Sequence, residues 1–309
     1  MATVVQSRAE IRALIVRAKR WDVIFVALGI LALGIGLATF VVLFVDTLID
    51  GWSRLRPEFF TEFPSRRAGQ AGILSAWVGT TLVMLVTAAV AVPVGVAAGI
   101  YLEEYAPKHW ITDVIEININ NLAGVPSIVY GLLALGLFVY SFGLGQSIRT
   151  AGLTLALLIL PVVIVATREA IRSIPKMVRE GSYAVGATKW QTVRDHVVPY
   201  SMPGILTGVI IGMSRAIGET APIITIGALT FIAFLPPSPV TSEFPFLSFE
   251  WLKAPFTVMP IQMFNWTSRP DEAFHANAAA AGTILVFMTL LMNGLAIYLR
   301  FRLRKNIKW

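Results

Sequence analysis

Long apolar blocks alternate with short polar stretches along this chain. Each block is close to the ~20 residues that a helix needs to cross about 30 Å of hydrocarbon. Within the blocks the apolar residues are continuous and do not alternate with polar ones, which argues against the strands of a membrane barrel. The pattern therefore predicts an all-α integral membrane protein with six transmembrane helices, over residues 23–46, 76–100, 117–141, 150–168, 204–233 and 279–300.

An amphipathic stretch precedes the first block. Ile11, Leu14, Ile15 and Ala18 form one apolar stripe, while Arg and Lys occupy the remaining positions. This spacing is typical of a helix lying in the membrane interface, although a frayed basic tail is the alternative. We therefore expect an N-terminal interfacial helix over 1–22, one transmembrane domain over 23–300 and a basic tail over 301–309.

Composition and charge agree with a membrane protein. The chain has 309 residues, of which 56% are hydrophobic and 14% charged, whereas ordinary soluble domains have about a quarter of their residues charged. An even number of spans places three basic clusters on one side, and the positive-inside rule makes that side cytoplasmic, together with both termini. The net charge of +7 thus follows membrane topology, so nucleic-acid binding is not expected. The clusters are Arg8, Arg12, Arg17, Lys19 and Arg20; Arg168, Arg172, Lys176, Arg179, Lys189 and Arg194; and Arg300, Arg302, Arg304, Lys305 and Lys308.

Several kinds of catalytic chemistry lack their residues in this sequence. There is no Cys and no Gly-Lys dipeptide, so the chain has neither thiolate chemistry nor the usual phosphate-binding loop of an ATPase. His109, His196 and His275 are far apart and form no metal-binding motif. We therefore expect neither an enzyme nor a metal site, and no cofactor in this chain.

Two long stretches fall on the external side, at 47–74 and 234–277. Both are rich in aromatic residues, which suits either interfacial anchoring or contact with another protein. The two readings, a plug in the interface and a surface that docks a receptor, stay open.

The polar segment between the fourth and fifth blocks predicts two short helices. Pro175 suits a first helical turn, and Gly186 suits the bend after that helix. Thr188 and Gln191 have the spacing of a capping box for the next helix. Pro199 is then expected to force a break before the fifth span. A rigid helix–turn–helix of this kind can seat in the groove of a partner.

The fifth block carries charged residues within the membrane. Arg215 lies eleven residues after Gly204, which is roughly 16 Å along a helix and near the bilayer centre. Because a central Arg costs roughly 2.5–3.5 kcal/mol, such residues usually face the interior of the bundle. Glu219 follows at the spacing where helical side chains meet, with Thr220 beside it and a helix kink expected at Pro222. An Arg fork suits a tetrahedral oxyanion, although a pair that only joins helices is the alternative.

The third block combines amides with a proline-interrupted motif. Asn118, Asn120 and Asn121 precede the sequence GVPSIVYG at 124–131. Pro126 is expected to kink the helix and to free the Leu122 carbonyl. The hydroxyls of Ser127 and Tyr130 are candidates for the substrate path, and helix packing is an equally good explanation of this segment.

Three segments carry a family resemblance. Glu180, Gly186 and Pro199 match the EAA loop of ABC-transporter permeases, with departures at Gly181, Ser182, His196 and Val198. Together with LAGVPSIVYGLLALGLF at 122–138 and SRAIGETAPI at 214–223, the chain resembles the permeases of phosphate-specific ABC importers, of the type I (MetI-like) family. The similarity runs from about residue 75 to the C-terminus.

The resemblance implies a fold, partners and site residues. It implies a six-span permease domain in a bacterial cytoplasmic membrane, with a coupling loop at about 172–200. The implied partners are a sister permease (PstC), an ATPase dimer (PstB) that binds ATP and Mg, and an extracytoplasmic phosphate-binding protein (PstS). Glu180, Gly186, Thr188 and Pro199 would contact the ATPase, and Arg215 and Glu219 match the charged pair of the family.

These expectations combine into one mechanism. ATP binding would close the ATPase dimer and draw two coupling loops together, so that the helices open outward to the loaded binding protein. Phosphate would compete with Glu219 for Arg215. The alternatives are a permease for another oxyanion, such as molybdate, sulfate or phosphonate, and an ATP-independent transporter or channel.

Overall fold

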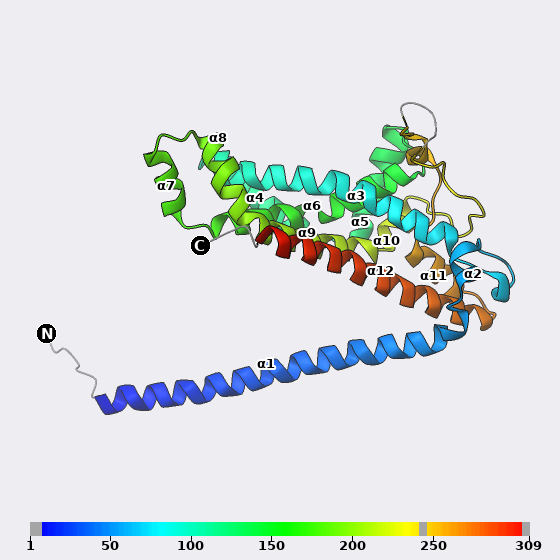
Figure 1. Ribbon diagram of the computed structural model, residues 1–309, viewed down its shortest axis with the longest axis horizontal. Helices are drawn as coiled ribbons and strands as arrows, with labels where there is room; N and C mark the ends of the chain where they lie inside the picture. Colours follow the sequence, from blue (N-terminus) through cyan, green and yellow to red (C-terminus); the bar gives the residue numbers. More distant parts are fainter. Residues whose placement is uncertain (1–7, 241–245, 305–309) are drawn as a thin grey trace. The chain divides into compact units, whose positions relative to one another are not determined.

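The computed structural model describes residues 8–240 and 246–304 (Figure 1). These ranges are mostly helical, and one isolated antiparallel bridge joins Val240 and Leu247. The expected all-α class is therefore confirmed. By contact, the chain divides into two units, residues 1–50 and residues 51–309.

The first unit is almost entirely one helix, α1 (Arg8–Gly51), of 44 residues. It continues without interruption through the boundary that we expected between residues 22 and 23. Within residues 17–54, the most apolar window of 18 residues has a mean hydropathy of 2.7, which is high enough for a membrane-spanning helix. Of the expected interfacial stripe, Ile15 and Ala18 are exposed, whereas the side chains of Ile11 and Leu14 lie outside the described residues, and the stripe stays a prediction.

Four long helices form the centre of the second unit. They are α3 (Leu74–Ile100), α6 (Ile148–Arg172), α9 (Val198–Ile217) and α12 (Ala273–Arg304). α6 packs between α3 and α9, and α12 packs on α9. Among the candidate spans of the described chain, α6 is the most buried. α12 ends at Arg304, so most of the expected basic tail lies outside the described residues.

A stripe of glycines allows α9 to approach α6 closely. Gly204, Gly208 and Gly212 recur every four residues on one face of α9. A Cβ at Gly204 or Gly208 would collide with the side chain of Ala170 or Ala166 on α6. Small residues at this spacing let membrane helices meet backbone to backbone, and van der Waals contact then holds them together.

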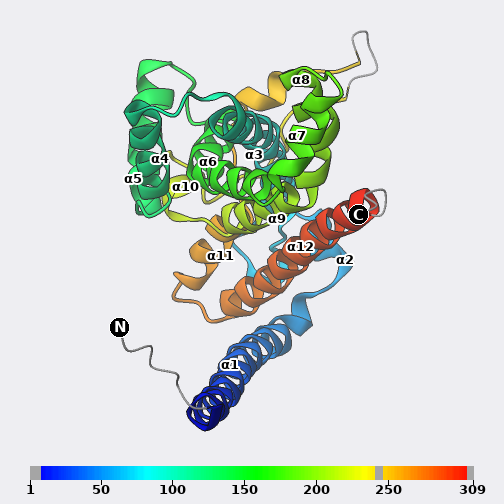
Figure 2. The ribbon, with the colours of Figure 1, turned by 90° about the vertical axis from the view of Figure 1, so that its left-hand side faces the viewer.

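The third expected span is broken rather than continuous. α4 (Trp110–Leu122) is followed by α5 (Ser127–Ala134), with a bend of 106° between α4 and the α5 segment, and a π-helical stretch, η4 (Leu135–Ser141), continues α5. Pro126 is the N-cap of α5 with extended ψ of 134°, so it ends one helix and starts another instead of kinking a single one. Figure 2 shows α4 and α5 together at one side of the bundle.

The fifth expected span is shorter than residues 204–233. α9 ends at Ile217, and a separate short helix, α10 (Ala221–Thr225), follows. Gly218 closes α9 and Pro222 lies in the first turn of α10, where its missing N–H costs nothing. The expected kink at Pro222 is therefore a break before it. From 226 onwards the described chain is irregular up to the turn η6 (Glu250–Lys253).

The two aromatic-rich stretches that we expected on the external side pack, from residue 51 onwards, against the bundle of the second unit. They contain η1 (Trp52–Arg54), α2 (Pro57–Thr61), η2 (Ala68–Gln70) and α11 (Met259–Thr267). Phe59 and Trp266 are buried with ring centroids 5.9 Å apart. Arg54 Nε donates to Asn277 Oδ1 at 2.6 Å, which ties η1 to α12. Much of this aromatic content is therefore core, whereas Trp52 and Phe249 are exposed.

The span count agrees with a membrane bundle. Within the described ranges, five helices are long and apolar enough to cross a membrane, and the number becomes six if the bent pair is one span. The structure thus confirms the helical membrane class and revises the third and fifth spans.

Candidate functional site

The polar segment between α6 and α9 protrudes from one end of the bundle as two short helices (Figure 1). They are α7 (Lys176–Ala184), which Pro175 caps, and α8 (Lys189–Thr192). Gly186 has φ of +86°, a region that glycine occupies without strain. At the start of α8, Thr188 N donates to Gln191 Oε1 at 2.8 Å and Gln191 N donates to Thr188 Oγ1 at 3.3 Å. The expected bend and capping box are both present.

Pro199 does not break the chain as we expected. A π-helical turn, η5 (Val193–Val197), leads from α8 into α9, and Pro199 lies in the first turn of α9. The wider π turn changes the hydrogen-bonding pattern where the proline lacks its N–H. The helix therefore continues from α8 into α9, so the protruding segment is directly connected to a membrane helix.

The two helices of this protrusion and the bend between them expose large apolar side chains. Val185 is 85% exposed, Met177 78% and Trp190 63%. Glu180 is exposed as well, on the same helix as Met177. All three large apolar side chains lie on an otherwise polar segment of the chain.

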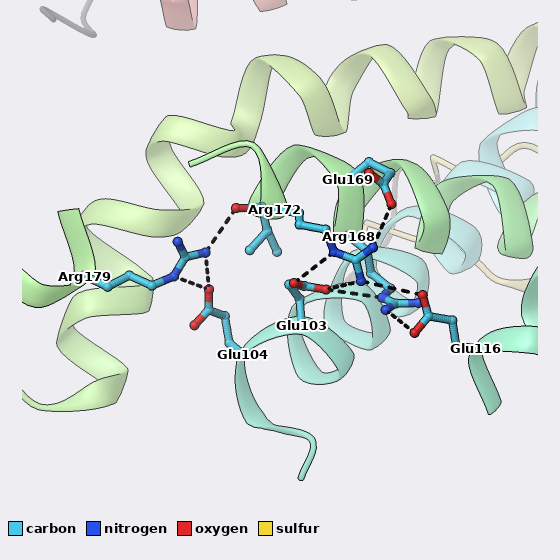
Figure 3. A network of polar contacts seen from close by, with 8 residues as sticks. Glu103, Glu104, Glu116, Arg168, Glu169, Arg172 and Arg179 are labelled. Atoms are coloured by element: carbon cyan, nitrogen blue, oxygen red, sulfur yellow. Dashed lines mark hydrogen bonds and ion pairs between the residues drawn. The ribbon is translucent and has the colours of Figure 1, made fainter. Parts of the chain in front are cut away.

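An ion-pair network lies at the base of the protrusion (Figure 3). It centres on η3 (Tyr101–Tyr105), a π-helical turn that extends α3. Glu103 accepts two hydrogen bonds from Arg172, at 3.0 and 3.2 Å, and Glu104 accepts two from Arg179, at 2.6 and 2.8 Å. The network therefore joins α3 to both α6 and α7.

A second branch of the network reaches α4. Arg168 is 6% exposed and pairs with Glu116 at 2.7 Å. The interior position of Arg168 makes this pairing necessary, because an unpaired buried charge is very unfavourable. The sequence suggested Arg168, Arg172 and Arg179 only as topology signals. The adjacent carboxylates of Glu103 and Glu104, in a loop predicted to lie on the same side as these basic residues, were the available hint of pairing.

The charged pair of the fifth span forms at the end of α9. Arg215 Nε lies 3.3 Å from Glu219 Oε1, with 40% of the Arg side chain and 18% of the Glu side chain exposed. Arg215 is seventeen residues after the start of α9, which is roughly 26 Å along the helix. Because Glu219 follows the helix end, the two groups meet at a break in the backbone.

The GVPSIVYG motif lies against the segment that follows this pair. A Cβ at Gly131 would collide with Thr225 and Pro222 of α10. Tyr130 is buried, and its hydroxyl donates to the Leu122 carbonyl at 2.9 Å. The same carbonyl accepts from Val125 N at 3.1 Å, so the proline-containing turn does not leave it free as we expected. The tyrosine hydroxyl adds a second bond to this carbonyl, which is a packing role.

Two candidate residues of the substrate path remain, Thr220 and Ser127. Thr220 is the N-cap residue of α10, and its Oγ1 lies 3.5 Å from the Gly218 carbonyl. Ser127, the first residue of α5, is half-buried and has no hydrogen bond to Arg215 or Glu219 within the described chain. The structure therefore brings the two motif segments together without adding Ser127 to the charged pair.

Comparison with protein families identifies one match. Residues 91–305 match the family of binding-protein-dependent transport system inner membrane components. These residues include α4 to α12, and hence the protrusion and the Arg215–Glu219 pair.

Relatives and solved structures agree with this match. The chain is 32% identical to the probable ABC transporter permease protein YqgI of Bacillus subtilis over 275 residues, covering 87% of this chain and 92% of that protein. It is 31% identical to the phosphate transport system permease protein PstA 1 of Mycobacterium tuberculosis over 238 residues, covering 77% and 73%. A chain of the MetNI methionine ABC transporter has a similar fold, with a TM-score of 0.53, 17% identity and coverage of 75% and 94%.

Proposed function

Since this chain belongs to the family of binding-protein-dependent transport system inner membrane components, we propose that it is the PstA-type permease subunit of an ATP-driven phosphate importer. Family membership makes it a multi-pass ABC transporter permease, a subunit that is not itself an ATPase. The relatives named as phosphate permeases support phosphate as the cargo.

One observation carries the substrate proposal: a partly exposed guanidinium within an apolar bundle. Arg215 contacts Glu219 through Nε, and it has no second ion pair within the described chain. The rest of the planar fork is available for two parallel bonds to a tetrahedral oxyanion. Glu219 keeps the site from binding the anion too tightly, because phosphate must displace the carboxylate to enter and the carboxylate helps to expel it.

The protrusion supports a coupling function. Met177, Val185 and Trp190 give α7 and α8 an apolar surface for an ATPase, and Glu180, Gly186, Thr188 and Pro199 belong to the same segment. The proposed assembly pairs this chain with a PstC-type sister permease, a PstB-type ATPase dimer that binds ATP and Mg, and a PstS-type phosphate-binding protein. The termini and the protrusion would lie on the cytoplasmic side of a bacterial inner membrane.

The proposed cycle is alternating access. ATP binding closes the ATPase dimer and draws the protrusions of the two permeases together, and the bundle then opens toward the loaded binding protein. Hydrolysis returns it to the inward-open state. A permease for another oxyanion would share this mechanism, and an ATP-independent transporter or channel would not need the protrusion.

Substitution of Arg215 tests the substrate site. We expect Arg215→Gln to lower phosphate uptake in reconstituted liposomes by at least about tenfold, because bonds to charged groups contribute roughly 1.5–3 kcal/mol. Arg215→Lys is the matched control: it keeps the charge without the fork and should retain an intermediate rate. Normal uptake by an assembled Arg215→Gln variant would refute the site.

A further inference from the structure

The turn η3 contacts three different helices through three successive residues. Glu103 binds Arg172 of α6, Glu104 binds Arg179 of α7, and the Tyr105 ring lies 5.0 Å from Lys189 Nζ of α8. Because η3 is a π-helical continuation of α3, it joins these helices directly to a membrane span. π-Helical turns inside longer helices often occur at functional sites.

The Glu104–Arg179 contact is the most enclosed part of this junction. The Glu104 side chain is 7% exposed and that of Arg179 is 18% exposed, and two hydrogen bonds join them (Figure 3). Arg179 also donates to the carbonyls of Ile171 and Ile174 at 3.0 Å each. One guanidinium therefore fixes α7 to η3 and to the end of α6.

Other contacts of α7 with the bundle are sparse. Ser182 is the one buried residue of α7, and its Oγ lies 2.9 Å from Thr192 Oγ1 of α8, which belongs to the same protrusion. Val178 adds partial packing near Ile171 and Val197. A short helix held by little apolar packing depends on its ion pair for a fixed orientation, because a buried charge pair tolerates little separation.

We propose that the turn η3 transmits the movement of α7 and α8 to α3, with Glu104 and Arg179 as the positioning residues of this link. The inference rests on the proposed function, since α7 and α8 have a movement to transmit only if they dock an ATPase. The pair acts by holding two elements together and touches neither ATP nor phosphate. Loss of the Glu104–Arg179 pair should leave ATP hydrolysis in place and lower phosphate transport. Loss of the docking surface on α7 and α8 would abolish both.

The test measures phosphate uptake and ATP hydrolysis in the same proteoliposomes that hold the complete complex. We expect Glu104→Gln and Arg179→Gln to assemble with the ATPase and hydrolyse ATP, while phosphate transported per ATP falls roughly 2- to 30-fold. The double variant should fall no further than either single variant, because the two residues act as one unit.

Two further variants make the test specific. Glu169→Gln is the matched control, since Glu169 is 63% exposed and its ion pair is with Arg172 of its own helix. This variant should transport as much phosphate per ATP as the wild type. Lys189→Gln removes an exposed cation together with its contact to Tyr105. This substitution should lower the phosphate transported per ATP by about twofold, which is the small end of known coupling effects.

Each result decides the inference. If the assembled single variants transport as much phosphate per ATP as the wild type, the inference is overturned. It is also overturned if the losses of the two single variants add up in the double variant. If the glutamine variants fail to assemble, an unchanged ratio in Lys189→Gln overturns it. A wild-type complex without ATP-driven uptake instead overturns the proposed function, and this inference with it.

Discussion

At Gly186 a single backbone angle determines whether α7 and α8 can meet at their observed bend. The φ of +86° is available to glycine and strained for a residue with a Cβ. No neighbouring atom lies within 4 Å of the position that a Cβ would take, so the constraint is conformational and not steric contact with another element.

Replacement of this glycine should weaken docking of the ATPase. Gly186→Ala disfavours the observed bend by roughly 1–2 kcal/mol, which corresponds to a rise of roughly 5- to 30-fold in the Kd for the ATPase. The measurement is binding of the purified ATPase subunit to the permease in nanodiscs.

The control for that measurement lies five residues earlier. Gly181 is exposed within α7, without a positive φ and without a neighbour near its Cβ position. Gly181→Ala should keep the wild-type Kd, because alanine favours the helix. Equal affinities for the two variants would show that the bend at Gly186 does not matter for docking.

At the scale of elements, local signals predicted the helices better than the contacts between them. Thr188 and Gln191 are three residues apart, so their capping box could be inferred from spacing alone. The break at Pro199 was a wrong prediction, because a π turn before a proline has no simple sequence pattern. The bounds of the third and fifth spans were predicted from the lengths of their apolar blocks. Block length does not show where glycine and proline divide one span into two helices.

The ion pairs around η3 could not be predicted from spacing. Glu104 and Arg179 are 75 residues apart, and Glu103 and Arg172 are 69 apart, so no helical period joins them. Their pairing depends on how α3, α6 and α7 meet in space. Arg215 and Glu219, four residues apart, were found because their contact is local.

The glycine face of α9 is the element on which we make a stability prediction. Gly208→Val places a branched side chain against Ala166 of α6, and overpacking costs roughly 1–3 kcal/mol. The midpoint of thermal unfolding in detergent should fall by several degrees, at about 2–4 °C per kcal/mol for a protein of this size.

The matched substitution is Gly294→Val in α12. Among the described residues, and apart from the neighbouring backbone of its own helix, no atom lies within 4 Å of the Cβ position of Gly294, so the change adds the same side chain without overpacking. If both variants melt at the same temperature, close approach of α9 to α6 does not stabilise the bundle.

At the scale of the whole molecule, the chain combines a charged pair at a helix break with a protrusion at the end of the bundle. α9 connects the two, since it begins at the protrusion and ends at Ile217, with Arg215 in its last turn. A movement of α8 therefore has a continuous helical route to the charged pair. This geometry gives a physical reason why an ATPase docked at one end would alter the proposed anion site at the other end of α9.

The most direct test of this account is uptake of labelled phosphate by liposomes that contain the chain with its proposed partners. We predict uptake that requires ATP and the ATPase subunit, that is lost on substitution of Glu180, and that unlabelled phosphate reduces while sulfate and molybdate do not. Phosphate uptake that continues without ATP would contradict the account.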